Sequence, residues 1–312
     1  MRERAYLREV GPRDGIQLVK QFLPTERKLE WCRAEAEAGV REIEVTSFVP
    51  ASVVPQFADA AEVVRGVSTI QDVQISALIP NVKGAQRGFD LGVPMLNFVV
   101  SASEAHNMAN VRRTTDESIA EFRKIIAERD RRGLKDKTRI AGGIATAFGC
   151  TLQGEVPETR VIEIARLLAQ AGADMIYLAD TVGYGNPAQV RRLFAAAVKE
   201  VRPLKVGAHF HDTRGLGIAN VTAALDVGIQ HFDASLAGLG GCPFAPGATG
   251  NINAEDCAFL LESMGFDTGI DIEALRQLRK RIEAWLPGEA FFGMVARAGL
   301  PKTFVRASKS AA

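Results

Sequence analysis

The sequence has few of the residues that build disulfide frameworks or structural zinc sites. Four cysteines are spread over 312 residues, and no two of them are spaced as CxxC. This excludes a small disulfide-stapled domain and argues against a structural zinc site. Cys32 and Cys257 fall within helix-like patterns, so we expect them to be buried packing residues. Cys242 differs from them because it lies in a glycine-rich segment.

Net charge and long apolar runs are also scarce. The formal net charge is +1, which leaves no electrostatic footprint for nucleic acid or an anionic membrane. No apolar run reaches about 18 residues, so we expect no transmembrane helix. The first residues lack the apolar stretch of a secretion signal. We therefore expect a cytoplasmic protein that binds neither nucleic acid nor a membrane.

Histidine is scarce as well, but its placement is informative. Of the four histidines, His209 and His211 stand two positions apart at the end of an apolar run. On a strand, such residues point to the same face, so the pair can bind one metal ion. The alternative is that both are hydrogen-bonded histidines of the core.

What the sequence does contain is a repeated alternation of short apolar runs and longer amphipathic segments. We expect eight strands, at Tyr6–Val10, Glu42–Thr46, Gln74–Ile79, Met95–Val100, Thr138–Ala145, Met175–Ala179, Lys205–His209 and His231–Ala234. Helical spacing separates many of them, for example at Thr25–Ala38, Asp116–Arg132, Pro157–Ala171, Pro187–Val201 and Gly217–Val227. Several of these segments end at a glycine suited to a left-handed cap, namely Gly39, Gly92, Gly172 and Gly228.

Eight such repeats favour an α/β fold of the (β/α)₈ or TIM-barrel type. The competing fold is an open doubly wound sheet, which often has a GxGxxG turn after its first strand. Here the first strand is followed by Gly-Pro-Arg-Asp-Gly, which does not fit that motif. We expect one catalytic domain over residues 1–312, with a helical C-terminal extension from about residue 271 to 312.

Polar residues follow the expected strands at their carboxyl ends, where barrel enzymes carry their active sites. The first strand leads into Arg13 and Asp14, and the seventh into His209 and His211. We expect Asp14 to complete a metal site with both histidines, and Asn251 to add a carbonyl oxygen. Nitrogen and oxygen ligands without a thiolate favour Mg²⁺, Mn²⁺ or Co²⁺ over structural zinc.

Other charged residues at this end allow two interpretations each. Arg13 would alternate with Asp14, and either forms a salt bridge across the mouth or stabilises a developing oxyanion. Glu44 is an acid on an apolar strand, and Arg13 is its obvious partner, so we expect Glu44 to orient Arg13. Asp180 either caps the helix that begins near Pro187 or orients a metal ligand or water.

A glycine-rich segment follows the eighth strand. Five of the thirteen residues from 238 to 250 are glycines, which predicts a mobile loop and, at a barrel mouth, a lid. Cys242 lies on this segment, next to Pro243. We expect its thiol to donate or accept a proton, or to respond to oxidation.

These residues stand in motifs that give the chain a family resemblance. The chain resembles the 3-hydroxy-3-methylglutaryl-CoA (HMG-CoA) lyases, within a wider family of metal-dependent barrels that includes isopropylmalate and homocitrate synthases. The motifs span nearly the whole chain and are Val10-Gly-Pro-Arg-Asp-Gly-Ile-Gln17, Glu44-Val-Thr-Ser-Phe-Val49, Pro80-Asn-Val-Lys-Gly84, Asp180-Thr-Val-Gly183, His209-Phe-His-Asp-Thr213 and Ala237-Gly-Leu-Gly-Gly-Cys-Pro-Phe244 with Gly250-Asn251.

The resemblance implies retro-Claisen-type cleavage of a 3-hydroxyacyl-CoA into acetyl-CoA and a 3-oxoacid. It implies a divalent metal bound by Asp14, His209 and His211 with help from Asn251. It also implies Arg13 at the reacting carbonyl and Cys242 on an active-site lid. We further place Glu44 and Asp180 in the catalytic set. We expect Gln17, Ser47 and Tyr177 to bind substrate. Lys83 is a candidate for the CoA phosphates, as are Arg112 and Arg113, although each also fits solvated surface charge.

One departure from the family pattern bears on the substrate. The chain reads Tyr177-Leu-Ala-Asp-Thr where the lyases commonly read Ser-Leu-Gly-Asp-Thr. The acyl pocket is therefore expected to differ, and the substrate is HMG-CoA or a related branched acyl-CoA. The alternatives are a synthase that condenses an acyl-CoA with a 2-oxoacid, a lyase for a different 3-hydroxyacyl-CoA, and a non-catalytic, metal-stabilised binding protein. A homo-oligomer, either a dimer or a tetramer, is possible.

Overall fold

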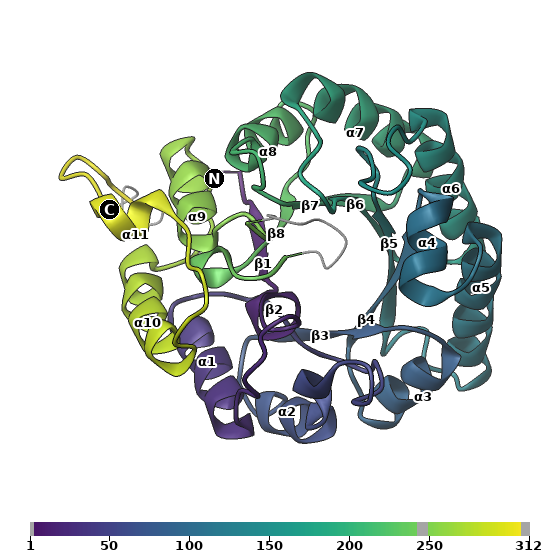
Figure 1. Ribbon diagram of the computed structural model, residues 1–312, viewed down its shortest axis with the longest axis horizontal. Coiled ribbons are helices and arrows are strands. Elements are labelled where there is room, and N and C mark those ends of the chain that lie inside the picture. Colours follow the sequence, from purple (N-terminus) through teal and green to yellow (C-terminus); the bar gives the residue numbers. More distant parts are fainter. Residues whose placement is uncertain (1–2, 242–248, 307–312) are drawn as a thin grey trace.

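Eight parallel strands follow one another around a closed barrel, and helices surround it (Figure 1). The computed structural model describes residues 3–241 and 249–306. Each strand pairs with the next along the chain, and the first pairs with the last. The strands are β1 Tyr6–Glu9, β2 Glu42–Ser47, β3 Gln74–Ile79, β4 Met95–Ser101, β5 Arg139–Ala145, β6 Met175–Asp180, β7 Lys205–Phe210 and β8 His231–Ala234. The predicted (β/α)₈ barrel is confirmed.

Where the sequence analysis predicts the bounds of a helix, the observed helix begins and ends within two residues of them. The helices are α1 Thr25–Glu37, α2 Ala60–Val67, α3 Val82–Asp90, α4 Glu104–Val111, α5 Thr115–Arg131, α6 Glu158–Ala171, α7 Pro187–Val201, α8 Gly217–Leu225, α9 Ala254–Ser263, α10 Ile272–Trp285 and α11 Met294–Ala298. Gly172, which ends α6, has a φ of 104°, a left-handed conformation that costs glycine little. No helix within the described ranges is long and apolar enough to cross a membrane.

The last helices lie together on one flank of the barrel. Helix α10 packs against α1 and α9, and α11 packs against α9 (Figure 1). The Asp256 carboxylate accepts the backbone N–H groups of Met294 and Val295, which are unsatisfied donors at the start of α11. These contacts fasten α10 and α11 to the rest of the barrel.

Alternation along the strands divides the barrel into an outer core and an inner layer. Outward side chains such as Ile140, Ile176 and Phe232 are fully buried beneath the helices. Inward side chains at the amino ends of the strands form a separate small cluster of Met95, Ala141, Met175 and Tyr177. This cluster closes the bottom of the barrel, so the open space lies at the carboxyl ends.

Candidate functional site

The turn after β1 places two charged residues at the mouth of the barrel. Residues Gly11–Gly15 form one π-helical turn in which the Val10 carbonyl accepts the N–H groups of Arg13, Asp14 and Gly15. Arg13 and Asp14 therefore lie on a helical turn, and the predicted strand-like alternation between them is wrong. Their side chains contact each other, with 2.5 Å between Arg13 Nη1 and Asp14 Oδ1.

Three of the predicted metal ligands converge at this mouth. The Nε2 atoms of His209 and His211 lie 3.1 Å apart, and each is 3.9 Å from Asp14 Oδ2. At this separation the two nitrogens need a proton or a cation between them, because two facing lone pairs would repel each other. Within the described ranges, these three residues form the one group of His, Cys and acidic side chains whose ligand atoms converge in this way. The group fits a metal ion.

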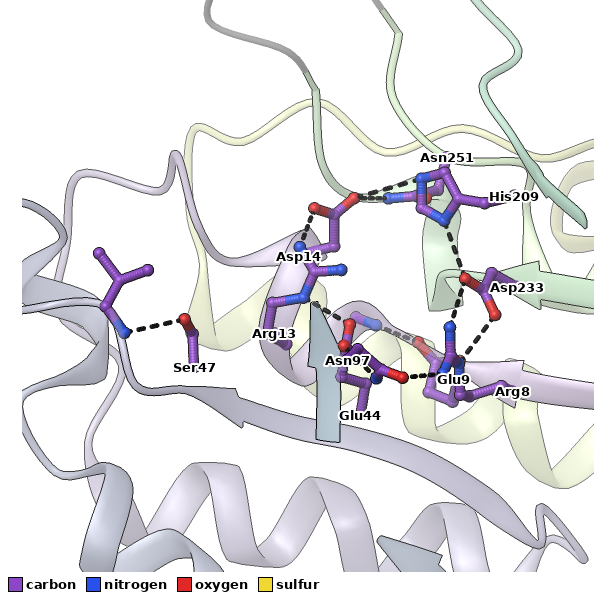
Figure 2. Close-up of polar contacts among 12 residues, drawn as sticks. Arg8, Glu9, Arg13, Asp14, Glu44, Ser47, Asn97, His209, Asp233 and Asn251 are labelled. Atoms are coloured by element: carbon purple, nitrogen blue, oxygen red, sulfur yellow. Dashed lines mark hydrogen bonds and ion pairs between the residues drawn. The ribbon is translucent and has the colours of Figure 1, made fainter. Parts of the chain in front are cut away.

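The fourth predicted ligand also lies in place. Asn251 Nδ2 donates to Asp14 Oδ2 at 2.7 Å and to the Leu239 carbonyl at 3.0 Å (Figure 2). Its Oδ1 is buried and has no hydrogen-bond partner in the described part of the chain. A buried amide oxygen without a partner is costly, and a cation at this position would satisfy it.

A carboxylate behind His209 fixes the orientation of that ring. Asp233 Oδ2 lies 3.0 Å from His209 Nδ1, which therefore carries the proton and leaves the Nε2 lone pair toward Asp14. Metal-binding histidines commonly have such a carboxylate partner. Arg8 holds Asp233 in turn, through Nε and Nη2 at 2.8 Å each.

These contacts continue into a closed ring of polar side chains (Figure 2). Arg13 Nε donates to Glu44 at 2.5 Å, so the predicted partnership between these two residues is present. Asn97 connects the two halves of the ring, donating to Glu44 at 2.6 Å and accepting from Arg8 at 2.9 Å. Because every charge in the ring has an opposite charge or an amide beside it, the ring holds its geometry without solvent.

Burial and charge set the protonation states that a metal site needs. Burial alone would raise the pKa of Asp14, but Arg13 and the two imidazoles outweigh it and hold the pKa at about 2. Burial, with His209 close by, lowers the pKa of His211 to about 3. At neutral pH, Asp14 is therefore an anion and His211 a neutral imidazole, which are the forms that bind metals.

The metal-ligand group borders a cavity of about 390 Å³, which several other predicted residues also reach. Gln17 and Tyr177 line it, and the Arg8 guanidinium stacks 4.2 Å from the centre of the Tyr177 ring. Ser47 is not part of the described lining; its hydroxyl accepts the Val49 N–H at 3.1 Å instead (Figure 2). Lys83 is exposed on α3, also outside the described lining. Cys242 lies outside the described residues.

Asp180 holds the loop that follows β6. Its carboxylate accepts the N–H groups of Tyr184 at 2.8 Å and Gly185 at 3.0 Å. Burial raises the pKa of Asp180 to about 6, although these two hydrogen bonds oppose the shift. The residue that caps α7 is Asn186, so the interpretation of Asp180 as the cap of that helix is wrong. Its role in orienting a ligand or water stays a prediction.

A second acidic cluster lies behind the site and joins its two loops. Glu9 accepts the N–H of Gly11 at 2.6 Å and that of Leu236 at 3.0 Å, the first residues of the turns after β1 and β8. A side chain at Gly11 would place its Cβ 2.5 Å from Glu9 Oε1, so only glycine fits. Glu255 accepts the Ala237 N–H at 3.0 Å. The acids fix where both loops leave the barrel.

Sequence reasoning missed Arg8, Asn97, Asp233 and Glu9 as parts of the site. Arg8, Asn97 and Asp233 could have been found, because each is a polar residue in an otherwise apolar strand. Each also lies two positions from another residue that points into the barrel, and so shares its face of the strand. Glu9 points the other way from Arg8, toward the helices, and gave no such signal.

Comparison with known proteins assigns the family. The family model described as HMGL-like matches residues 4–282. The chain belongs to the HMGL-like family. A 3-hydroxy-3-isohexenylglutaryl-CoA/hydroxymethylglutaryl-CoA lyase of Pseudomonas aeruginosa is 38% identical over 94% of this chain and 96% of its own. The hydroxymethylglutaryl-CoA lyase YngG of Bacillus subtilis is 36% identical over 89% and 91%.

Solved structures of the HMGL-like family agree with the fold. An HMG-CoA lyase from A. baumannii, in complex with coenzyme A and 3-methylmalate, superposes with a TM-score of 0.90 at 40% identity, covering 97% of both chains. The family predicted from the motifs is therefore confirmed, and with it the class of enzyme, a carbon–carbon lyase.

Proposed function

We propose that this HMGL-like protein is a divalent-metal-dependent lyase that cleaves HMG-CoA or a related 3-hydroxyacyl-CoA. The products are acetyl-CoA and a 3-oxoacid. The observation that carries the proposal is the convergence of Asp14, His209 and His211 beside Arg13 at one cavity. The relatives support the substrate class, since their names give HMG-CoA and isohexenylglutaryl-CoA lyases, and the A. baumannii structure holds coenzyme A.

Asp14, His209 and His211 would hold the metal, with Asn251 Oδ1 as a further ligand. Two imidazoles with oxygen ligands and no thiolate suit Mg²⁺ or Mn²⁺. When bound there, the metal would polarise the substrate hydroxyl and so make its proton easier to remove. Asp233 keeps the His209 Nε2 lone pair directed at the site.

Arg13 is placed to stabilise the charge that develops during cleavage. When the hydroxyl proton leaves, the C2–C3 bond breaks, C3 becomes a ketone, and the electron pair forms the enolate of acetyl-CoA. Glu44 and Asp14 hold two of the guanidinium nitrogens, and Nη2 makes no hydrogen bond within the described part of the chain. Nη2 can therefore donate to the enolate oxygen, and a proton delivered to C2 completes acetyl-CoA.

Glu44 acts on the reaction through Arg13. It lies fully buried at the end of a hydrogen bond from Arg13 Nε, and Asn97 occupies its other oxygen. With both oxygens engaged, Glu44 fixes the plane of the guanidinium. We assign it as a positioning residue.

A mass-spectrometric assay on a panel of 3-hydroxyacyl-CoAs tests the proposal. The protein is incubated with each thioester and Mg²⁺ or Mn²⁺, and acetyl-CoA and the 3-oxoacid are quantified. We expect both products in equal amounts from at least one branched substrate. Release of free thiol from acetyl-CoA mixed with a 2-oxoacid, without cleavage of any 3-hydroxyacyl-CoA, would identify a condensing synthase and overturn the proposal.

A further inference from the structure

The part of the cavity lining that comes from β3 to β6 contains small apolar residues. Leu78, Val99, Gly143, Ala145 and Ala179, contributed by β3 to β6, line this side, and we call them the small-residue wall. Gly143 and Ala145 are two positions apart on β5, and so point to the same face of the strand. The wall therefore belongs to the inner layer of the barrel.

The small-residue wall is unusually open for the interior of a barrel. Bulky branched side chains normally fill this space in layers. Here Leu78, Val99, Gly143 and Ala179 are only partly buried, although their side chains point into the barrel. Three of the five wall residues carry at most one side-chain carbon. The space that larger side chains would fill is left to the cavity.

The small-residue wall offers nothing to an anion. Of the arginines that line the cavity, Arg8 is engaged by Asp233 and Asn97, and Arg13 by Glu44 and Asp14. The remaining one in the described lining, Arg113, lies at the rim, where it donates to the Pro80 carbonyl after β3. A carboxylate placed against the wall would be buried without a partner, which is costly.

We propose that the small-residue wall binds an apolar substituent on C3 of the substrate that is longer than a methyl group. This assignment rests on the proposed function. C3 carries a hydroxyl, the thioester arm, a carboxylate arm and one further substituent. The first two are directed to the metal-ligand group and Arg13, and the carboxylate arm needs polar partners such as Asn110 and Arg113 at the rim.

The wall also has the length that such a substituent needs. The loop after β2 continues it toward the mouth, because Val49, Pro50 and Val53 line the same cavity. Val53 is 69% exposed, an apolar side chain left open to solvent at the entrance. A chain of several carbons on C3 would cover Val99 and Leu78 and extend toward Val53. The preferred substrate therefore has a linear or branched alkyl or alkenyl group at C3.

Binding of uncleavable analogues tests the wall directly. The probes are 3-methylglutaryl-CoA and 3-butylglutaryl-CoA, which lack the hydroxyl, titrated into the Mg²⁺-loaded protein by calorimetry. Each buried methylene strengthens binding roughly fourfold, so we expect the butyl compound to bind at least about tenfold more tightly. Equal or weaker binding of the butyl compound would overturn the assignment.

Substitutions in the small-residue wall test whether the tighter binding of the butyl analogue arises there. Ala179→Val fills the wall at β6, and we expect the ratio of the two dissociation constants to fall to near one. Ala188→Val is the matched control, since Ala188 is exposed on α7, and it should keep the wild-type ratio. If Ala179→Val does not fold, Gly143→Ala tests the same point, because its new Cβ would lie 3.3 Å from Val99 and in ordinary contact elsewhere. We expect that variant to lower the ratio at least about threefold, and an unchanged ratio in a folded wall variant would contradict the assignment.

Cleavage assays separate this assignment from the proposed function. If the butyl analogue binds more tightly but neither HMG-CoA nor 3-hydroxy-3-butylglutaryl-CoA is cleaved, the wall assignment stands and the proposed function fails. If HMG-CoA is cleaved and the methyl analogue binds as tightly as the butyl analogue, the function stands and the wall assignment fails.

Discussion

The two sides of the barrel mouth differ in polarity and packing: one carries paired, buried charges and the other carries small apolar side chains. On the side of β1, β2, β7 and β8, buried charges form a closed ring in which each group has a partner at 2.5–3.0 Å, except where Asp14 faces His209 at 3.9 Å. On the side of β3 to β6, Val99, Gly143 and Ala179 line the cavity with apolar surface and are only partly buried. Asn97 and Val99, two positions apart on β4, mark the border.

This difference separates two tasks within one cavity. Catalysis by charge stabilisation requires groups that do not reorganise during the reaction, and a ring of paired charges provides them. Choice among substrates needs only shape, and an apolar wall discriminates between alkyl groups by roughly fourfold for each methylene that it buries. Substitutions in the ring should therefore change rate and metal binding, whereas substitutions in the wall should change substrate preference.

The largest effect is expected from removing a metal ligand. His211→Ala should leave too few ligands for the ion and lower acetyl-CoA formation about 1,000-fold or more, because a bound metal contributes several kcal/mol to such reactions. Metal content after dialysis, measured by atomic emission, should fall in parallel. His231→Gln is the control, as His231 stacks on Tyr6 away from the cavity, and it should retain its metal. A His211→Ala protein with wild-type turnover would contradict a catalytic role for the metal-ligand group.

Arg13 should be next in size. Arg13→Met removes the donor for the enolate, and we expect kcat to fall about 100- to 1,000-fold while the metal stays bound. Both kcat and metal content are measured, because a merely structural role for Arg13 would lower the two together. A kcat within threefold of wild type would show that another group stabilises the charge.

Asp233 tests the ring behind the ligands. In Asp233→Asn, the side-chain amide can donate to His209 Nδ1 and so move the ring proton to Nε2, and we expect metal affinity to fall about 10- to 100-fold. Titration with Mn²⁺ gives the affinity, at a temperature where circular dichroism shows the variant folded. Asp226→Asn, which alters an exposed ion pair with Arg191, is the matched control. Equal Mn²⁺ affinities in the two variants would show that Asp233 does not orient His209 for metal binding.

The smallest effect is expected in the acidic cluster behind the site. Burial raises the pKa of Glu9 to about 8, despite its two backbone hydrogen bonds, and that of Glu255 to about 7. Burial and the neighbouring Glu9 charge raise the pKa of Glu35 well above its ordinary range. The folded protein therefore holds more protons than the unfolded chain, and its stability should fall as pH rises toward about 8.

A thermal melt across pH measures this. His211 and His231 have lowered pKa values, so they act in the opposite sense below pH 6.5, and the interval from pH 6.5 to about 8.5 isolates the acids. Wild-type Tm should drop over this interval, and Glu35→Gln should flatten the drop while keeping an acceptor for Trp31 Nε1. Glu37→Gln, an exposed neighbour on α1, should leave it unchanged. If Tm changes with pH equally in all three proteins, Glu35 does not cause the loss of stability.

The sequence predicted one side of the mouth far better than the other. His209 and His211 are conspicuous because strand period places two chelating side chains on one face. Asp14 follows the first strand, at the end of the barrel where active sites lie. The turn at Gly11–Gly15 was not predictable in detail, because its π-helical form is a backbone arrangement in which three N–H groups share the Val10 carbonyl. The small-residue wall had no signal at all: Gly143, Ala145 and Ala179 resemble ordinary strand residues until the closed barrel brings β3 to β6 around one cavity.

Metal-dependent cleavage is tested by acetyl-CoA formation from HMG-CoA with the Mg²⁺-loaded protein, compared with Asp14→Asn under the same conditions. Asp14 is the ligand that both imidazoles face and that Arg13 and Asn251 hold in place. We expect acetyl-CoA and acetoacetate in equal amounts from the wild type, and a loss of about 1,000-fold in the variant. Cleavage at the same rate by both proteins, or with chelator in place of metal, would contradict it.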